Sequence, residues 1–265
     1  QNTHNLTVDL AKKIFGDHVN AAADFNNKTY YTQAIEKLEF AESICKSVSG
    51  VYCDDNLSKE FSKAYNGKLN DYCSKAEKAI AAKAFKDAEA LIATATMLVE
   101  NQPDYFNDPE ALNNMNIGLY NAYISNGFEL LAKNDYENAL NGFESANVLC
   151  LKHSYIECSE ELSKGIYQSK YGIYQDKLDQ VKSTLSNDAI NAENLLNQTV
   201  QYRQSQSLEQ SELETDLRNK IKYQIYTELI EKGKNLAVSK VYDQALDQYN
   251  AAKNLEISYN FKKDP

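Results

Sequence analysis

The sequence predicts an all-α protein built from repeated helical hairpins. Only 9 Gly and 3 Pro occur among its 265 residues, which is too few turn-forming residues for the many hairpins of an all-β sandwich or barrel. Apolar residues make up 43 % of the chain and are spread along its length, which indicates a continuous core rather than disorder. A third observation, a recurring pattern of small and bulky residues, predicts the order of the helices.

The recurring pattern has seven positions and is clearest in the middle of the chain. There it reads Gly127, Leu130, Tyr136, Ala139, Phe143, Ala146 and Leu149. The same spacing recurs over residues 22–44, 76–98 and 233–255. A weaker copy has Ser186, Ala189 and Leu196 in the aromatic and the two alanine positions. The aromatic positions of the five copies are 31, 85, 136, 186 and 242, which gives a period of 50 to 56 residues.

Each copy predicts two helices joined by a short turn. The intervals of three and four residues between Tyr136, Ala139 and Phe143 place these side chains on one stripe of a helix, where small alanines allow a neighbouring helix to approach closely. A second amphipathic stretch precedes each aromatic. The polar breaks between the two helices lie at residues 26–28, 83, 133–135 and 239–240. The predicted hairpins lie around 8–50, 54–101, 109–152, 155–203 and 212–258, with a long first helix such as 56–82.

The skeleton resembles the tetratricopeptide repeat, in which small, apolar and aromatic residues at these spacings hold a helical hairpin together. The resemblance covers residues 8–255 and is complete in the copy that starts at Gly127. The repeat is longer than the roughly 34 residues usual in the family, and the family's Trp in the first helix and Pro after the second are missing. The resemblance implies a right-handed α-solenoid of about five helical hairpins, a superhelix forming one domain over residues 1–265.

The connectors between hairpins alternate between two kinds, which indicates a duplicated double hairpin followed by a closing hairpin. The short connectors correspond at an offset of 105 residues and carry the cysteines Cys45, Cys53, Cys150 and Cys158. The other two connectors, residues 101–110 and 201–215, are longer. In the first of these, Asp108 followed by Pro109 predicts the start of a helix.

The cysteine positions predict two disulfides, Cys45 with Cys53 and Cys150 with Cys158. A tight reversal between two helices could bring each pair of sulfurs together. The alternative is that cysteine is a small buried residue at equivalent packing sites, copied by duplication. Disulfides favour an oxidising compartment, periplasmic or extracellular, whereas reduced cysteines would fit the cytoplasm. Cys73 is expected to be a buried thiol on a helix face.

Composition and motifs argue against several classes of function. The formal charge of −10 disfavours nucleic-acid binding through a basic surface, and the longest apolar stretch, residues 90–99, is too short to cross a membrane. The sequence has no glycine-rich phosphate loop and no Cys/His spacing suited to zinc, and its three His lack a nucleophile or ligand arrangement. We therefore expect no cofactor, no metal and no catalytic residue. The start at Gln1 fits either a removed signal peptide or a boundary within a longer protein.

The resemblance implies that a protein or peptide partner binds on the concave face, which the first helices of the hairpins line. Transfer of the family's inner-face positions gives Val19, Asn26, Asn27, Asn70, Glu77, Ile80, Asn121, Ile124, Phe128, Leu131, Tyr171, Tyr174, Thr227, Ile230 and Lys234. Tyr171 and Tyr174 also belong to a helical stripe that begins at Tyr167, which is either a stacking platform or hairpin core. The sequence thus predicts a non-enzymatic scaffold within a larger envelope or secreted complex.

Two other functions stay open at the level of sequence. The chain could be a sensor that holds a small peptide or glycan in the groove of the superhelix. It could also be an enzyme that uses carboxylates such as Asp104 and Glu110. The second is disfavoured because acidic residues at helix starts complement the helix dipole without any catalytic role.

Overall fold

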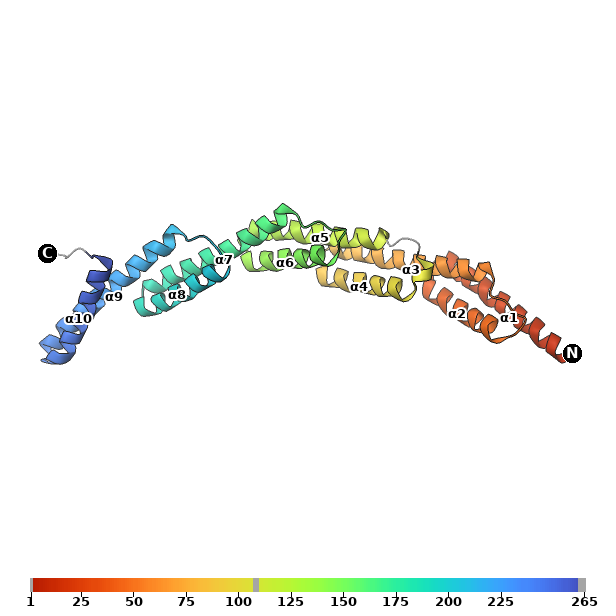
Figure 1. Cartoon of the computed structure of the whole chain (residues 1–265), viewed down its shortest axis with the longest axis horizontal. Coiled ribbons are helices and arrows are strands. Elements are labelled where there is room, and N and C mark those ends of the chain that lie inside the picture. Colours follow the sequence, from red (N-terminus) through yellow and green to blue (C-terminus); the bar gives the residue numbers. More distant parts are fainter. Residues whose placement is uncertain (1, 107–109, 262–265) are drawn as a thin grey trace. The chain divides into compact units, whose positions relative to one another are not determined.

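The computed structural model describes residues 2–106 and 110–261, with side chains from Leu6 onward, and this part of the chain is all-α. It forms ten α-helices and one short 3-10 helix, η1, without a strand (Figure 1). The first helices of the hairpins are α1 (Asn2–Asn27), α3 (Asp55–Ala81), α5 (Glu110–Leu131), α7 (Glu160–Leu185) and α9 (Glu212–Val238). The second helices are α2 (Tyr31–Ser47), α4 (Phe85–Asn101), α6 (Tyr136–Lys152), α8 (Ala189–Ser205) and α10 (Tyr242–Tyr259), and η1 covers Pro103–Tyr105. The predicted helix start at Asp108 and Pro109 lies outside the described residues.

The chain divides into two compact units, and the division passes through the hairpin of α5 and α6. The first unit is Gln1–Tyr123 with Ser145–Cys158, and the second is Ile124–Glu144 with Ser159–Pro265. In the first unit, α1 packs on α2 and α3 packs on α4, while α2 and α1 both contact α3. In the second unit, α7 packs on α8 and α9 on α10, while α8 and α7 both contact α9. Successive helices are thus neighbours in space within each unit.

The predicted seam of small and bulky residues forms the hairpin core. In α2 and α6 the side chains at the alanine and bulky positions are fully buried, as Ala34, Leu38 and Ala41 and as Ala139, Phe143 and Ala146. Alanine leaves room for the backbone of the partner helix, and the larger side chains fill the space between turns. The seven-position pattern therefore predicted which face of α2, α4, α6 and α10 is buried.

The fourth copy of the pattern lies three residues later than expected. α8 begins at Ala189, while Ser186 is the C-cap residue that follows α7. The buried stripe of α8 is Ala189, Ala192, Leu196 and Thr199. This copy was misplaced because alanine stands where the other copies have an aromatic and threonine stands at the second alanine position. With this correction the second helices begin 51 to 54 residues apart.

In four of the hairpin turns the first helix ends with a residue in the left-handed conformation. In the first of them, Thr29 has a φ of 62°. The N–H of Tyr30 donates to the carbonyl of Phe25 at 2.9 Å, as in a Schellman motif. The other left-handed residues in these turns are Lys83, Asn134 and Lys240. The turn between α7 and α8 differs, because the side chain of Asp188 caps α8 by accepting from the N–H of Asn191 at 2.9 Å. Each turn therefore satisfies backbone groups that the helix ends leave open.

Glycines let an aromatic ring of a second helix lie against the backbone of a neighbouring first helix. A Cβ on Gly67 would lie 2.2 Å from the ring of Tyr31, and a Cβ on Gly172 would lie 2.2 Å from the ring of Tyr136. The two contacts are equivalent, because Tyr136 and Gly172 lie 105 residues after Tyr31 and Gly67. Phe143 is held in the same way, since a Cβ on either Gly127 or Gly165 would come within 2.8 Å of its ring. The close approach of α2 to α3 and of α6 to α7 thus requires glycine at these positions.

The two predicted cysteine pairs lie at disulfide distance. Cys45 in α2 pairs with Cys53 just before α3, and Cys150 in α6 pairs with Cys158 just before α7, each with a Cα–Cα distance of 5.2 Å. This distance is typical of disulfides. Cys73 is buried and unpaired among the described cysteines, and burial raises the pKa of its thiol. The disulfides hold the two short connectors closed.

We expect Gly67→Ala to destabilise the protein by roughly 1–3 kcal/mol, because the added methyl group overlaps the ring of Tyr31. Gly16→Ala in α1 is the matched control: a Cβ there has no neighbour within 4 Å, and alanine gains about 1 kcal/mol of helix propensity. Urea unfolding followed by circular dichroism measures both changes. Equal shifts for the two variants would refute the ring-on-glycine contact.

The disulfide pairing predicts the number of free thiols. Unfolding without reductant should expose one reactive thiol, that of Cys73, and reduction should expose all five cysteines. Because each disulfide closes a short loop, its reduction should lower the free energy of unfolding by roughly 2 kcal/mol. Thiol titration and thermal unfolding with and without reductant measure both effects, with Cys73→Ser as the control that leaves no thiol before reduction. Five thiols before reduction would contradict the pairing.

Candidate functional site

The predicted inner-face residues differ widely in exposure. Six of them are exposed: Asn27, Asn70, Glu77, Asn121, Thr227 and Lys234. Six are partly buried: Ile80, Ile124, Phe128, Leu131, Tyr171 and Ile230. The remaining three are buried and are discussed next: Val19, Asn26 and Tyr174. A surface that contacts a partner can therefore include the first two groups only.

Val19 and Asn26 belong to the core of the first unit instead of a binding surface. Val19 is 2 % exposed and packs in the cluster formed by α1, α2 and α3. The amide of Asn26 donates to the carbonyl of Glu60 at 3.0 Å and to its carboxylate at 2.8 Å. Because these polar groups are buried, the bonds join α1 to α3 at low dielectric. Both residues hold the hairpins together and are covered by their own chain.

Tyr174 is also a core residue, and the offset of 105 residues gives the reason. It is the counterpart of Leu69 in α3, which is buried as well. Tyr174 lies 15 residues before Ala189, as Asn121 lies before Tyr136, so its burial does not follow from the misplaced fourth copy. The ring of Tyr171 contacts that of Tyr174 with a centroid distance of 5.7 Å, and that of Tyr167 at 6.1 Å. The tyrosine stripe thus runs from an exposed ring at Tyr167 into the core.

A buried ionic cluster around Glu214 was not found by sequence reasoning. The hydroxyl of Tyr174 donates to the carboxylate of Glu214 at 2.8 Å, and the backbone N–H of Ser211 donates to the same hydroxyl at 3.1 Å. Arg203 Nε donates to Glu214 at 2.9 Å, and Arg218 lies 3.5 Å from the other oxygen. Burial, with the bond to Glu214, raises the pKa of Tyr174 to about 12. One available signal was that these are the chain's two arginines, and arginine is suited to buried carboxylates.

A groove of the second unit lies between the end of α7 and α9, and we call it the α9 groove. Its volume is about 610 Å³, which is within the usual range for ligand sites. Apolar and aromatic side chains are interspersed with amides and one cation along its wall. The lining residues are Leu185, Asn219, Lys220, Tyr223, Gln224, Thr227 and Phe261. Thr227 is the sequence-predicted inner-face residue that this groove includes.

The chain's own Phe261 lies against the wall of the α9 groove. Asn260 adopts a left-handed conformation, with φ 50° and ψ 44°, directly after α10. The ring of Phe261 then contacts the rings of Tyr223 at 5.4 Å, Tyr226 at 5.5 Å and Tyr259 at 5.7 Å between centroids. These tyrosines provide an apolar surface with polar edges. The α9 groove can thus accommodate an aromatic side chain carried by a non-helical segment.

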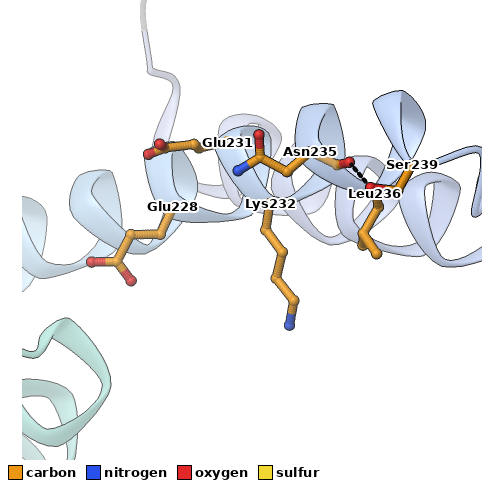
Figure 2. A pocket seen from close by; sticks show the side chains of 6 residues that line it. All are labelled: Glu228, Glu231, Lys232, Asn235, Leu236 and Ser239. Atoms are coloured by element: carbon orange, nitrogen blue, oxygen red, sulfur yellow. Dashed lines mark hydrogen bonds between the residues drawn. The ribbon is translucent and has the colours of Figure 1, made fainter.

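A second hollow lies along the C-terminal half of α9 and is open to solvent. It has a volume of about 400 Å³ and is lined by Glu228, Glu231, Lys232, Asn235, Leu236 and Ser239. Figure 2 shows that these side chains come from one helix and point in different directions, with Glu228 and Lys232 on one side and Glu231 on the other. The drawn hydrogen bond joins the hydroxyl of Ser239 to the carbonyl of Asn235 at 3.0 Å. Side chains that diverge in this way do not form a catalytic constellation.

Two smaller grooves, one in each unit, occupy equivalent positions at the offset of 105 residues. One is lined by the turn around Tyr31 and by Lys68, Asp71 and Lys75, and the other by the turn around Tyr136 and by residues 173–180. Their volumes are about 220 and 240 Å³. The second groove contains Asp176, whose pKa is raised by burial and by the nearby carboxylates of Asp179 and Glu137. Duplication has therefore kept the shape of the groove while its charges have diverged.

Neither a metal site nor a membrane span is found in the described residues. Within them, no group of three or more His, Cys, Asp and Glu side chains is placed to hold a metal ion. No helix among them is both long enough and apolar enough to cross a bilayer.

His153 lies with its Nδ1 atom 3.2 Å from the hydroxyl of Tyr155. Burial and the nearby charge of Lys152 lower the pKa of its imidazole.

No protein-family model, no curated protein and no solved structure matches the chain.

The ionic cluster predicts a specific loss of stability. Glu214→Gln removes the charge that pairs with Arg203 and Arg218, so we expect the free energy of unfolding to fall by about 2 kcal/mol or more. Glu231→Gln, at an exposed position of the same helix, should change it by less than about 0.5 kcal/mol. Urea unfolding of the two variants makes the comparison. Similar values for both would show that the cluster contributes little.

Proposed function

We propose that the protein is a tetratricopeptide-like scaffold that binds a protein or peptide partner through the inner face of its first helices. On this proposal the hairpins continue one another as a right-handed solenoid. The repeated pairing of a long first helix with a 17- or 18-residue second helix supports the proposal. So do the contacts of α3 with α1 and α2 and the contacts of α9 with α7 and α8.

The α9 groove carries the proposal. It is an open groove on the first helix of a hairpin, with tyrosines and amides rather than convergent acids, bases or nucleophiles. Tyrosine offers contact area together with a hydrogen-bonding hydroxyl, which suits protein recognition. Phe261 already occupies one edge. The corresponding ligand is a peptide segment that presents an aromatic side chain between Leu185 and Tyr223.

The compartment is part of the same proposal. Two cysteine pairs at disulfide distance support an oxidising environment, periplasmic or extracellular. The acidic surface that a net charge of −10 creates keeps such a scaffold soluble and favours partners without strong negative charge.

A site-specific cross-link tests the proposed surface. A benzophenone amino acid placed at Thr227 should form a protein adduct in extracts of the source organism, and mass spectrometry identifies the adduct. Gln198, exposed on α8, is the control position and should form none. Tyr223→Ala should then weaken the identified interaction at least tenfold, because aromatic anchors dominate such interfaces.

Phe261→Ala provides the opposite change, because it frees the edge of the groove. The affinity of the same partner should rise in this variant. Equal adducts at Thr227 and Gln198, or a partner affinity that neither substitution alters, would contradict binding in the α9 groove. A mass shift of the intact protein without any protein adduct would instead indicate a small ligand.

A further inference from the structure

The turn between α1 and α2 holds a threonine in a conformation that this residue type rarely adopts. Thr29 has a φ of 62°, in the left-handed region. A β-branched side chain is strained there, because its Cβ and the two branches crowd the adjoining backbone. Among the residues that the structure describes, Thr29 is the only β-branched one with a positive φ.

The equivalent turns show that threonine is not needed to form this turn. Their left-handed residues are Lys83, Asn134 and Lys240, and asparagine is favoured in that conformation. The hydroxyl of Thr29 donates to the carbonyl of the adjacent Lys28 at 2.6 Å, so it joins no other helix to the turn. A strained residue without a structural requirement points to a function for its side chain.

The hydroxyl of Thr29 lies two residues after an exposed asparagine. Asn27, Lys28 and Thr29 form the triplet Asn-X-Thr, which is the acceptor sequence for N-linked glycosylation. All three residues are exposed. Asn27 is the last residue of α1, and its side-chain carbonyl accepts from Nζ of Lys63 at 2.7 Å at the protein surface. The surroundings of Asn27 therefore leave room for a bulky polar group.

The other triplets of this kind are less suited to modification in the folded chain. Asn56 lies in the first turn of α3, and Leu57 inside its triplet is 4 % exposed. Asn197 lies within α8, and the hydroxyl of Thr199 is bonded to the backbone of that helix at a 3 % exposed residue. The side chain of Asn5 is outside the described part of the chain. The triplet of Asn27 is thus the one, among those described, that extends beyond a helix into a turn.

We propose that Asn27 carries an N-linked glycan. The inference rests on the oxidising compartment of the proposed function, because the glycan is added in the secretory pathway in which disulfides also form. The donor is an oligosaccharide linked to a lipid diphosphate. Nδ2 of Asn27 forms a bond to C1 of the first sugar and gives up one proton, while the bond from C1 to the diphosphate oxygen breaks and the lipid diphosphate leaves.

The glycan would restrict partner binding in the first unit. Asn27 is one of the predicted inner-face residues, and a glycan on it excludes another protein from the surface around Asn27 and Lys63. A partner would then use surfaces away from this turn. The α9 groove of the second unit is one of them.

Mass spectrometry of the protein purified from its source organism tests the modification. Peptide N-glycosidase in heavy-oxygen water converts a glycosylated asparagine to a labelled aspartate. The tryptic peptide of residues 14–28 should carry the label at Asn27. The peptide that contains Asn197 is the control and should carry none, because the hydroxyl of Thr199 is buried in α8.

Matched variants separate the hydroxyl of Thr29 from its conformation. Thr29→Ser and Thr29→Asn both remove the β-branch, and both residue types are left-handed elsewhere in the chain, at Ser207 and Asn134. Only serine keeps a hydroxyl, so secretion from a eukaryotic host should label Asn27 in Thr29→Ser and leave it unlabelled in Thr29→Asn. Without a glycan, as made in a bacterial periplasm, both variants should unfold about 2–4 °C above the unsubstituted chain, because the strain is relieved.

The results that contradict the proposal are distinct from those that contradict the compartment. Native protein with both disulfides formed and Asn27 unlabelled would overturn the glycan while the compartment stands. Five free thiols in the native protein would overturn the compartment itself. Labelling of Asn27 in Thr29→Asn, or unfolding temperatures that neither variant changes, would overturn the role assigned to the threonine.

Discussion

The architecture depends on aromatic rings that lie directly on glycine backbone. Tyr31 on Gly67 and Tyr136 on Gly172 set the distance between a second helix and the first helix of the next hairpin. A ring against bare backbone gives broad van der Waals contact at a separation that no side chain would permit. The disulfides lie at the opposite end of the same helix pairs, where Cys45 and Cys150 hold the reversals closed. Each of these helix pairs is thus fixed at both ends, by packing at one and by a covalent bond at the other.

Buried polar groups inside the units fix the position of one helix along another, which the apolar seam alone does not determine. An alanine seam is similar along its length, so it permits small shifts of one helix along another. The bond from Asn26 to Glu60 and the cluster of Glu214 with Tyr174 are specific in position, because a shift would leave a buried polar group without its partner. These bonds therefore contribute more to the register of the helices than to the net stability of the fold. The connector before α9 is tied to the same cluster, because Arg203 donates to the carbonyl of Leu208 at 3.4 Å and the N–H of Ser211 donates to the hydroxyl of Tyr174 at 3.1 Å.

The sequence predicted the hairpins well because their determinants are local. The alanine spacing defined the buried face of α2, α4, α6 and α10, and a copied pair of cysteines identified each tight reversal. The fourth copy was misplaced because Ala189 and Thr199 no longer carry the aromatic and alanine signals. Tyr174 was assigned to a surface, whereas its counterpart at the offset of 105 residues is the buried Leu69. The α9 groove could not be predicted, since it depends on the left-handed turn at Asn260 and on contacts between residues distant in sequence.

Duplication explains why two parts of this chain repeat the same contacts while their exposed positions differ. Tyr31 on Gly67 and Tyr136 on Gly172 are equivalent contacts at the offset of 105 residues, because any side chain in place of the glycine would overlap the ring. The diverged charges of the paired grooves beside Tyr31 and Tyr136 show that exposed positions of the duplicated unit have been free to change.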